Sequence, residues 1–396
     1  MRPPRAPRLL YLTNSDWIGG MERSVVNLSR ELTDRGWAVR SVFLETPRTP
    51  ALLEWARAQG FEAESSPALL SYFERHTYRR MFALRRLVAR SGADVVHVHV
   101  GSNFLPLKDV LAMRLSGRRT CVASIHSAEP WTGDNRNARR KTRAAAALCH
   151  LLIVHSNATR QVLLDAGVPA RKIRLITLGV RAPDGRPARD AARARLGIPA
   201  SAFVVTTNAR LEPHKGIADL IAATAQLPDP EGSIVLQIAG EGPQRQDLER
   251  LAAMLLPGRA RFLGHVADHA DLYAATDVFA MPTRNAKESF GLVFIEAAFH
   301  GVPSVGTRVG GIPDAIVDRQ TGLLVPPNAP AELAVALDRL RADDALRSRL
   351  GLAAQARAHE LFTVGRMADR YEEAYGERVL NRISTTGQDS ANARIR

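Results

Sequence analysis

Short apolar segments alternate with segments of helical period along the chain, and this alternation constrains the fold more than any other feature. In the first half the apolar segments are residues 9–12, 38–44, 95–100, 121–125 and 151–154. The segments between them carry apolar residues at the spacing of an amphipathic helix. Strands that are joined by helices predict a parallel sheet with helices on its faces.

The same alternation begins again in the second half and predicts a second sheet. Its apolar segments are residues 203–207, 234–239, 261–263, 278–281 and 302–305. A chain of 396 residues exceeds what one hydrophobic core usually supports, so two domains are expected.

We place the two domains at residues 1–180 and 181–380. Residues 171–195 are rich in proline, glycine, arginine and alanine, and we interpret them as the linker. The chain from about residue 331 to residue 381 is expected to be helical, and its last helices are free to pack back on the first domain. Residues 381–396 are polar and are expected to be disordered.

Doubly wound parallel sheets bind ligands beyond the carboxyl ends of their strands, so the loops after the strands matter most for function. The second half has four such loops, at residues 209–216, 240–243, 288–296 and 309–314. Each loop alone has a plain interpretation as a solvated turn between a strand and a helix. Their succession within one domain favours a ligand site.

The third loop has a glutamate at each end of a glycine-containing turn. It runs from Glu288 to Glu296 and reads Glu-Ser-Phe-Gly-Leu-Val-Phe-Ile-Glu, with a helix expected to start near Phe294. Amides at a helix N-terminus stabilise negative charge, and glycine lets a ligand approach the main chain closely. Phosphate on the amides and hydroxyls on the carboxylates would suit a nucleotide sugar.

The first two loops add groups that fit the same ligand. Arg210 and Lys215 in the first loop could close on a diphosphate from two sides, with Gly216 opening the next helix. Gly242 in the second loop allows a close approach to the main chain.

In order, spacing and position after strands, the four loops resemble the C-terminal domain of the retaining glycosyltransferases of family 4. The resemblance covers roughly residues 203–380 and includes residues 321–326, and a looser one in the first half rests on residues 19–22, 94–99 and 124–127. It implies an α/β chain of the GT-B fold, in which two Rossmann-like doubly wound parallel-sheet domains face a central cleft. The first domain would lie on the acceptor side and the second would bind the nucleotide sugar.

The resemblance also implies roles for single residues. Arg210 and Lys215 would hold the donor diphosphate, and Glu296 would accept hydrogen bonds from the ribose. Glu288 and His126 would be the catalytic residues, both contacting the donor sugar, and His126 would hydrogen-bond it rather than act as a nucleophile. The other implied substrate-binding positions are Gly20, Gly242, Ser289, Phe290, Gly291 and Leu292.

The sequence predicts neither a metal nor a cofactor. Asp-x-Asp does not occur in it, and Glu62 and Glu64 lie far in sequence from the phosphate loops. Arg210, Lys215 and helix amides would then stabilise the leaving diphosphate. Where the family usually has glycine this chain has Ala209, a small change if the backbone φ there is negative.

The excess positive charge belongs to the first half of the chain. Residues 1–180 contain 28 Lys and Arg against 14 Asp and Glu, whereas the rest is balanced. In a helical projection of residues 73–90, arginines lie opposite an apolar face, beside Tyr78 and Phe82, and a second cluster of Arg and Lys occupies residues 136–143. The plain interpretation is a helix with solvated arginines. The alternative is that the arginine face of the helix binds an anionic membrane surface, where the protein would meet a lipid-linked acceptor.

The location is expected to be cytoplasmic, with peripheral association at the inner face of the membrane as the further expectation. No apolar run approaches the roughly 20 residues of a membrane-spanning helix, and two cysteines suggest no disulfide framework.

The leading hypothesis is a transferase that moves a sugar from a UDP- or GDP-linked donor to an acceptor hydroxyl with retention of configuration. The transferase would act in the assembly of a glycolipid, a lipopolysaccharide or an exopolysaccharide. The alternative is a non-hydrolysing nucleotide-sugar epimerase. Nucleic-acid binding is suggested by charge alone, and no known motif supports it.

Overall fold

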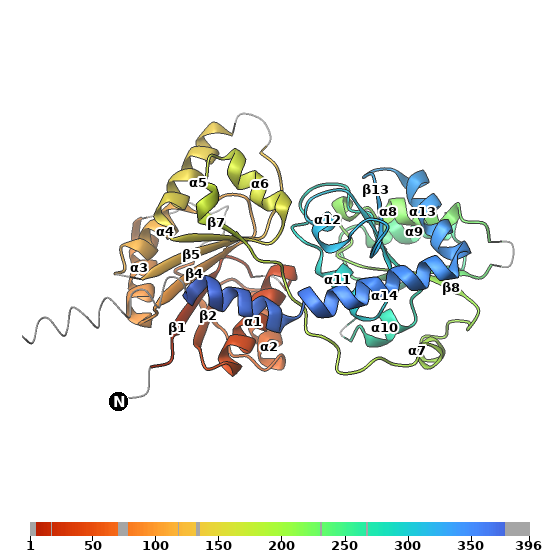
Figure 1. Cartoon of the computed structure of the whole chain (residues 1–396), viewed down its shortest axis with the longest axis horizontal. Helices are drawn as coiled ribbons and strands as arrows, with labels where there is room; N and C mark the ends of the chain where they lie inside the picture. The colour runs from red at the N-terminus through yellow and green to blue at the C-terminus, as the bar shows by residue number, and fades with distance from the viewer. Residues whose placement is uncertain are drawn as a thin grey trace, which may run out of the picture. The chain divides into compact units, whose positions relative to one another are not determined.

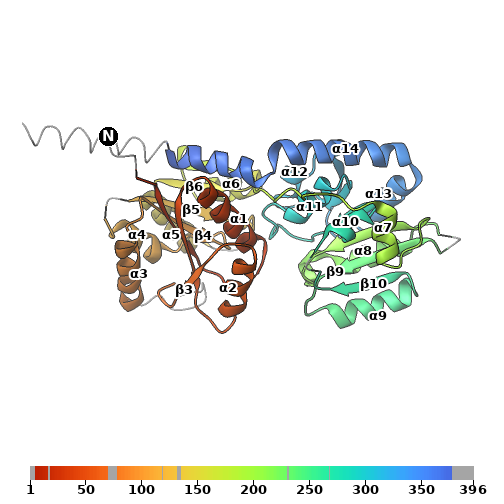
Figure 2. The same cartoon turned by 90° about the horizontal axis from the view of Figure 1, so that it is seen from below.

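The computed structural model describes residues 5–16, 18–69, 78–117, 119–131, 135–229, 232–266 and 268–376. The chain divides into two compact units. Unit 1 comprises the chain up to Gly179 together with the chain from Val364, and unit 2 runs from Val180 to Thr363. Figures 1 and 2 label the helices and strands of both units in two views.

In the described part of unit 1, seven strands form one parallel sheet in the order β3-β2-β1-β4-β5-β6-β7. The order reverses between β1 and β4, which makes the sheet doubly wound. The strands are β1 (Arg8–Thr13), β2 (Ala38–Leu44), β3 (Glu64–Ser66), β4 (Val95–Val100), β5 (Thr120–Ile125), β6 (Leu151–Val154) and β7 (Ile173–Leu175).

Helices connect these strands, and the strands in the middle of the sheet are covered on both sides. Every residue of β4, β5 and β6 is buried, as expected for central strands of a parallel sheet that is covered on both faces. The helices are α1 (Gly20–Asp34), α2 (Thr49–Ala58), α3 (Tyr78–Ser91), α4 (Leu107–Arg114), α5 (Arg136–Leu148) and α6 (Asn157–Asp165).

A helix over residues 364–376 returns the chain to unit 1. The Tyr375 hydroxyl lies 3.1 Å from the Tyr11 hydroxyl of β1, and both side chains are fully buried. Arg35 bonds Asp369 and Glu372 at 2.7 Å each. These contacts attach the last described helix to β1 and to the end of α1.

Unit 2, within its described residues, contains a six-stranded parallel sheet in the order β10-β9-β8-β11-β12-β13. Its order reverses between β8 and β11, so a crevice is expected beyond the carboxyl ends of these two strands. The strands are β8 (Phe203–Asn208), β9 (Ile234–Ala239), β10 (Ala260–Gly264), β11 (Val278–Met281), β12 (Ser304–Thr307) and β13 (Gly322–Val325).

The helices of unit 2 pack against one another in the following pairs. Helix α8 contacts α9 and α13, α14 contacts α13 and α11, and α10 contacts α7. The helices are α7 (Arg189–Arg195), α8 (Ile217–Ala225), α9 (Arg245–Leu255), α10 (Ala270–Ala274), α11 (Leu292–Phe299), α12 (Ile312–Ala315), α13 (Pro330–Ala342) and α14 (Asp344–Leu361).

The predicted fold class is confirmed, because both units are parallel α/β sheets, whereas some predicted bounds are wrong. The strand predicted at residues 302–305 is β12, which starts at Ser304 because the preceding Pro303 has no amide proton for the ladder. The predicted linker at 171–195 contains β7 and α7. The predicted helical end is interrupted at residues 362–363, and the polar tail at 381–396 lies outside the described residues.

Candidate active site

Lys215 and Glu288 meet at the point where the strand order of unit 2 reverses. Lys215 ends a short 3-10 turn after β8, and Glu288 lies in the loop after β11. The Nζ of Lys215 is 2.6 Å from Oε2 of Glu288, and both side chains are largely buried, with 17% and 16% exposed. The structure therefore brings together two of the residues predicted from separate loops.

The carboxyl of Glu288 is held in its ionised form. Burial would raise its pKa, but the positive charge and hydrogen bond of Lys215, with His214 and the amide of Gly291, outweigh that effect and lower the pKa below its usual value of 4.5. A carboxylate that is ionised and largely shielded from water can accept hydrogen bonds from ligand hydroxyls.

Helix α11 begins immediately after this carboxylate. Gly291 is its N-cap, with φ of 86°, and a Cβ at that position would lie 2.6 Å from the ring of Phe294. The helix therefore starts two residues before the predicted Phe294. The amide of Phe294 donates to the carbonyl oxygen of Gly291 at 3.0 Å, so the amides of Leu292 and Val293 before it are the ones suited to bind an anion.

Phe290 is placed differently from the ligand-facing residues of the same loop. Its side chain is fully buried and packs against Phe362, with ring centroids 5.4 Å apart. Only the main chain of Phe290 could then contact a ligand, as the prediction required.

Glu296 lies one helical turn into α11, within a cluster of polar side chains. Its Oε2 accepts a hydrogen bond of 2.9 Å from the Tyr273 hydroxyl and lies 3.3 Å from Nδ1 of His269. Asn208, which ends β8, places its Nδ2 3.3 Å from Nε2 of His269. These contacts fix the orientation of the Glu296 carboxylate.

Arg210 is paired within its own loop. Its guanidinium lies 2.6 Å from Oε1 of Glu212, and its side chain is about half exposed. His214 contacts the other oxygen of Glu212 at 3.2 Å. The predicted role of Arg210 on a diphosphate stays a prediction. Ala209 is not among the described residues with positive φ, so replacing the family's glycine there imposes no backbone strain.

Gly242 has a structural reason to be glycine. A Cβ there would lie 2.5 Å from the carbonyl oxygen of Leu211. The two loops are joined by main-chain hydrogen bonds, from Leu211 to Glu241 at 2.9 Å and from Gln244 to Leu211 at 3.0 Å. The predicted contact of Gly242 with a ligand stays a prediction beside this packing role.

The fourth loop supports the third. The amide of Gly311 donates to the carbonyl oxygen of Glu288 at 2.9 Å. Gly310 has φ of 53°, and a Cβ there would approach the same oxygen to 2.2 Å. The double glycine therefore allows the two loops to lie against each other and holds the main chain of Glu288 in place.

In unit 1, His126 follows β5 and lies among other histidines. Its Nε2 is 3.1 Å from Nδ1 of His99 and 3.3 Å from Nε2 of His155. His97 and His99, expected to be packed rather than catalytic, are buried. In the described part of the chain, no group of three or more His, Cys, Asp or Glu side chains is arranged to hold a metal ion.

Gly20 lies at the carboxyl end of β1, where the strand order of unit 1 reverses. It is exposed and is the first residue of α1. The preceding Gly19 donates its amide to the buried carboxyl of Glu22 at 3.0 Å. Burial raises the pKa of Glu22, and hydrogen bonds with Ser15 and Gly19 oppose that rise. Glu22 therefore stabilises the glycine loop.

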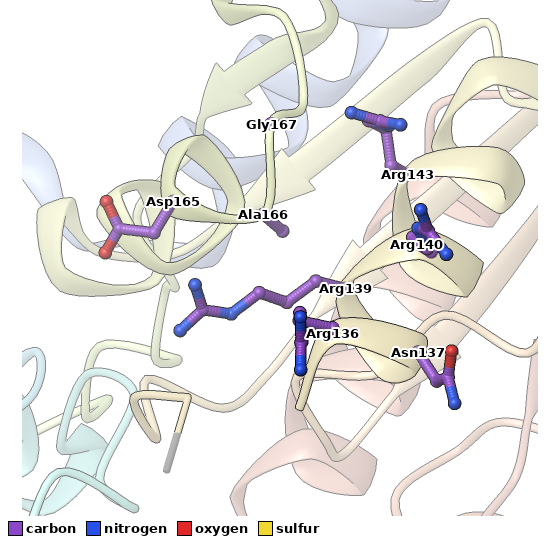
Figure 3. A pocket seen from close by; sticks show the side chains of 8 residues that line it. All are labelled: Arg136, Asn137, Arg139, Arg140, Arg143, Asp165, Ala166 and Gly167. Carbon is purple, nitrogen blue, oxygen red and sulfur yellow. The ribbon is translucent and has the colours of Figure 1, made fainter. Parts of the chain in front are cut away.

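Unit 1 also has a basic pocket, shown in Figure 3. It lies between α5 and the end of α6, and Arg139 extends across it beside Trp131, with its guanidinium carbon 5.9 Å from the centre of the indole. The Nε of Arg139 is buried and has no hydrogen-bond partner among the described residues. The lining residues are Arg136, Asn137, Arg139, Arg140, Arg143, Asp165, Ala166 and Gly167.

Comparison with solved structures gives the fold. The chain is similar to the Anabaena HepE protein in complex with UDP, with a TM-score of 0.80, 23% identity, and coverage of 93% of this chain and 100% of that one. It is also similar to a sucrose-phosphate synthase of Thermosynechococcus elongatus, with a TM-score of 0.74, 24% identity, and coverage of 93% and 98%. The fold is therefore that of the GT-B glycosyltransferases.

Sequence comparison gives the family. Residues 18–182 match Glycosyltransferase Family 4, and residues 188–357 match Glycosyl transferases group 1. A D-inositol 3-phosphate glycosyltransferase of Stackebrandtia nassauensis is 30% identical over 95% of this chain and 90% of its own. The one from Kineococcus radiotolerans is 34% identical, and its match spans 60% of this chain and 59% of its own length. The chain belongs to the family 4 glycosyltransferases, as the motifs predicted.

Family membership confirms the coarser part of the functional hypothesis: the protein is a glycosyltransferase. It favours the transferase over the epimerase alternative. No helix in the described ranges is both long enough and apolar enough to cross a membrane.

The sequence interpretation missed the partners of the predicted residues. Asn208, Tyr273 and His269 surround Glu296, and Glu212 pairs with Arg210. The position of Asn208 at the end of a buried strand was a usable signal for a residue at the ligand edge. Tyr273 and His269 carry no such signal, because only the packing of α10 beside α11 brings them to the site.

Proposed function

We propose that the protein transfers a sugar from a nucleotide-sugar donor to an acceptor hydroxyl with retention of configuration. The observation that carries this proposal is the Lys215–Glu288 pair at the N-terminus of α11, with the two groups 2.6 Å apart. A cation, an ionised carboxylate and helix amides together match a diphosphate joined to a polyhydroxylated ring.

In the proposed donor complex, Lys215 and the first amides of α11 bind the diphosphate, and Arg210 leaves Glu212 to join them. These groups stabilise the negative charge that grows on the leaving phosphate as the sugar–oxygen bond breaks. The leaving phosphate then helps to take the proton of the acceptor hydroxyl on the same face of the sugar. This arrangement needs no metal ion.

Glu288 and Glu296 have separate proposed tasks. Glu288 accepts hydrogen bonds from the sugar hydroxyls, and its negative charge stabilises positive charge developing at the anomeric carbon. Glu296 accepts the ribose hydroxyls, in an orientation that Tyr273 and His269 maintain. Ser289, Gly291 and Leu292 contribute main-chain groups to the sugar or phosphate.

The base of the donor is proposed to be uracil. The similar Anabaena protein has been solved with UDP, with UDP and glucose, and with UDP-glucose. UDP-glucose is therefore the first donor to test, and GDP-sugars are the second.

The acceptor is proposed to carry a phosphate, either free or as part of a lipid. The pocket between α5 and α6 presents several arginines and a buried guanidinium nitrogen without a partner among the described residues. Guanidinium groups bind phosphate through paired hydrogen bonds. The relatives named D-inositol 3-phosphate glycosyltransferase agree with a phosphorylated acceptor.

A lipid-linked acceptor would bring unit 1 to an anionic membrane surface at the inner face of the membrane. Helix α3 supports this proposal, because Leu84 and Val88 are buried while Tyr78 and Phe82 are 71% and 54% exposed among arginines. The part of the projected helix at residues 73–77 lies outside the described residues. Glycolipid or polysaccharide assembly is the corresponding cellular role.

The test is an incubation with UDP-glucose and other UDP- and GDP-sugars in the presence of EDTA. The proposal predicts slow release of nucleotide without acceptor and faster release with a phosphorylated acceptor, with the anomeric configuration of the product matching the donor by NMR. An epimerised nucleotide sugar would instead support the isomerase, and loss of activity in EDTA would contradict metal independence.

A further inference from the structure

Four histidines form a row across the carboxyl edge of the sheet in unit 1. His97 and His99 belong to β4, His126 follows β5 and His155 follows β6. Ring centroids are 4.3 Å apart between His97 and His99, 5.4 Å between His99 and His126, and 4.2 Å between His126 and His155. The resemblance to family 4 glycosyltransferases implies a role for His126 alone, and the other three histidines have no assigned role.

All four rings are neutral at pH 7. Burial and the neighbouring rings hold the pKa values of His97, His99 and His126 well below the usual 6.5. Burial lowers the pKa of His155 to about 4. A neutral imidazole carries a single N–H, so each ring has one nitrogen that donates and one that accepts.

The direction of the hydrogen bonds is set at one end of the row. The Nδ1 of His155 lies 2.8 Å from the carbonyl oxygen of Ile176, which can only accept. His155 therefore carries its proton on Nδ1, and its Nε2 is an acceptor. Because Nε2 of His126 is 3.3 Å from that atom, His126 must donate from Nε2.

His99 is compatible with this direction but does not determine it. Its Nδ1 lies 3.1 Å from Nε2 of His126 and accepts the same proton. Without His155, that contact could also form with His99 as the donor. The backbone carbonyl of Ile176, acting through His155, is what removes this ambiguity.

We propose that His155 is a positioning residue that keeps His126 in the Nε2–H tautomer, so that His126 offers its ligand a hydrogen-bond acceptor at Nδ1. That atom is buried and has no partner among the described residues. A sugar hydroxyl can donate to it, whereas an ionised phosphate oxygen cannot. His155 thereby makes His126 selective for the hydroxyl-bearing part of the ligand. The part of the proposal that concerns the ligand rests on the proposed function and on the predicted contact of His126 with the donor sugar.

The tautomer can be measured directly by NMR of protein labelled with ¹⁵N-histidine at pH 7.5. Long-range ¹H–¹⁵N correlations distinguish a protonated from an unprotonated ring nitrogen, and His126→Gln identifies the signals. The expected result is a protonated Nε2 and an unprotonated Nδ1 on His126. A protonated Nδ1 on His126 in the unaltered protein would overturn the proposal, and this measurement requires no variant of His155.

Three variants test the role of His155. His155→Phe keeps an aromatic ring in the row but removes both hydrogen bonds, and it should shift His126 toward the Nδ1–H tautomer. His97→Phe removes a buried ring at the other end of the row. That ring takes no part in the hydrogen bonds among His155, His126 and His99, so the tautomer of His126 should stay unchanged. His155→Gln carries a donor and an acceptor on one planar group and should restore the original tautomer. An unchanged His126 signal in folded His155→Phe would refute the role of His155.

Measurement of turnover distinguishes a failure of this inference from a failure of the proposed function. With UDP-glucose, His155→Phe should lower kcat/KM about tenfold while the affinity for UDP alone stays unchanged. If the protein turns over no nucleotide sugar, the proposed function fails but the tautomer measurement still stands. If turnover occurs and His155→Phe alters the tautomer without altering kcat/KM, the selectivity of His126 for a hydroxyl is refuted.

Discussion

Lys215 and Glu288 form an ion pair 2.6 Å long, and this pairing has a functional consequence. A diphosphate that binds Lys215 must share it with the carboxylate, and both side chains are largely shielded from solvent. Each group therefore influences the charge of the other, and removal of either one should affect stability.

Replacing Lys215 with alanine should weaken donor binding by roughly 1.5–3 kcal/mol, because a charge-assisted contact with the diphosphate is lost. Isothermal titration calorimetry with UDP and UDP-glucose measures this change. Lys287→Ala, an exposed lysine of the same loop, is the control and should bind normally. Unchanged affinity in Lys215→Ala would contradict its role on the diphosphate.

Replacing Glu288 with glutamine should lower kcat by roughly 10²-fold, because the neutral amide cannot stabilise positive charge at the anomeric carbon. The affinity for UDP should change much less, since UDP lacks the sugar that Glu288 contacts. Initial rates and calorimetry with the same preparation give the two values. An equal loss in both would indicate that Glu288 serves only in binding.

The Glu288 carboxyl should also make stability depend on pH. Its folded-state pKa is lowered from 4.5, so its contribution to the free energy of unfolding is fully present above that value. It is lost as pH falls through the lowered folded-state pKa. Urea unfolding of the unaltered protein and Glu288→Gln should show a stability difference at pH 7 that shrinks in acid. A difference that grows in acid would reverse the sign of the assigned shift.

At the scale of elements, the start of α11 depends on one backbone conformation. Gly291 has a positive φ, and the carbonyl of Glu288 is held by the double-glycine loop. These features decide where the helix amides lie relative to Lys215 and Glu288. The site is therefore as sensitive to loop packing as to the charged residues themselves.

Gly291→Ala should lower the free energy of unfolding by about 1–3 kcal/mol, because its Cβ would meet Phe294 and its φ is unfavourable for alanine. It should also weaken UDP binding by displacing the amides of α11. Gly258→Ala is the control, since Gly258 has φ of 72° but open space around its Cβ position. Urea unfolding and calorimetry distinguish the two, and equal behaviour would show that the contact with Phe294 is unimportant.

At the scale of the whole molecule, charge is distributed unevenly. The positive excess lies within residues 1–180, and several of these side chains line the α5–α6 pocket or surround the exposed rings of α3. Such a distribution attracts unit 1 to anionic ligands and surfaces over distances set by ionic strength.

The whole chain should float with vesicles that contain anionic lipid and not with neutral vesicles. Phe82→Ser should reduce the bound fraction several-fold, because an apolar ring no longer enters the interface. Leu352→Ser, at a residue 67% exposed in unit 2, should bind like the unaltered protein. Equal absence from both vesicle fractions would remove the membrane proposal.

Local sequence signals were sufficient to predict most helices and strands of the fold. Segments such as 38–44, 95–100 and 234–239 were predicted with the bounds of β2, β4 and β9, because each is a short, mostly apolar run rich in β-branched residues. β3 and β7 are three residues long, and β13 follows a turn, so none carries a comparable run. The family motifs likewise indicated Lys215 and Glu288 but not Asn208, His269 or His155.

The sequence by itself determined two parallel α/β units, the family, and the loops that carry the candidate chemistry, because strand hydrophobicity and motif spacing are local properties of the chain. Only the tertiary structure decided that Lys215 pairs with Glu288, that Arg210 pairs with Glu212, and that His155 directs the hydrogen bond of His126. These contacts join residues far apart in sequence. Their distances depend on strand order and loop packing, which bring the side chains to one edge of a sheet.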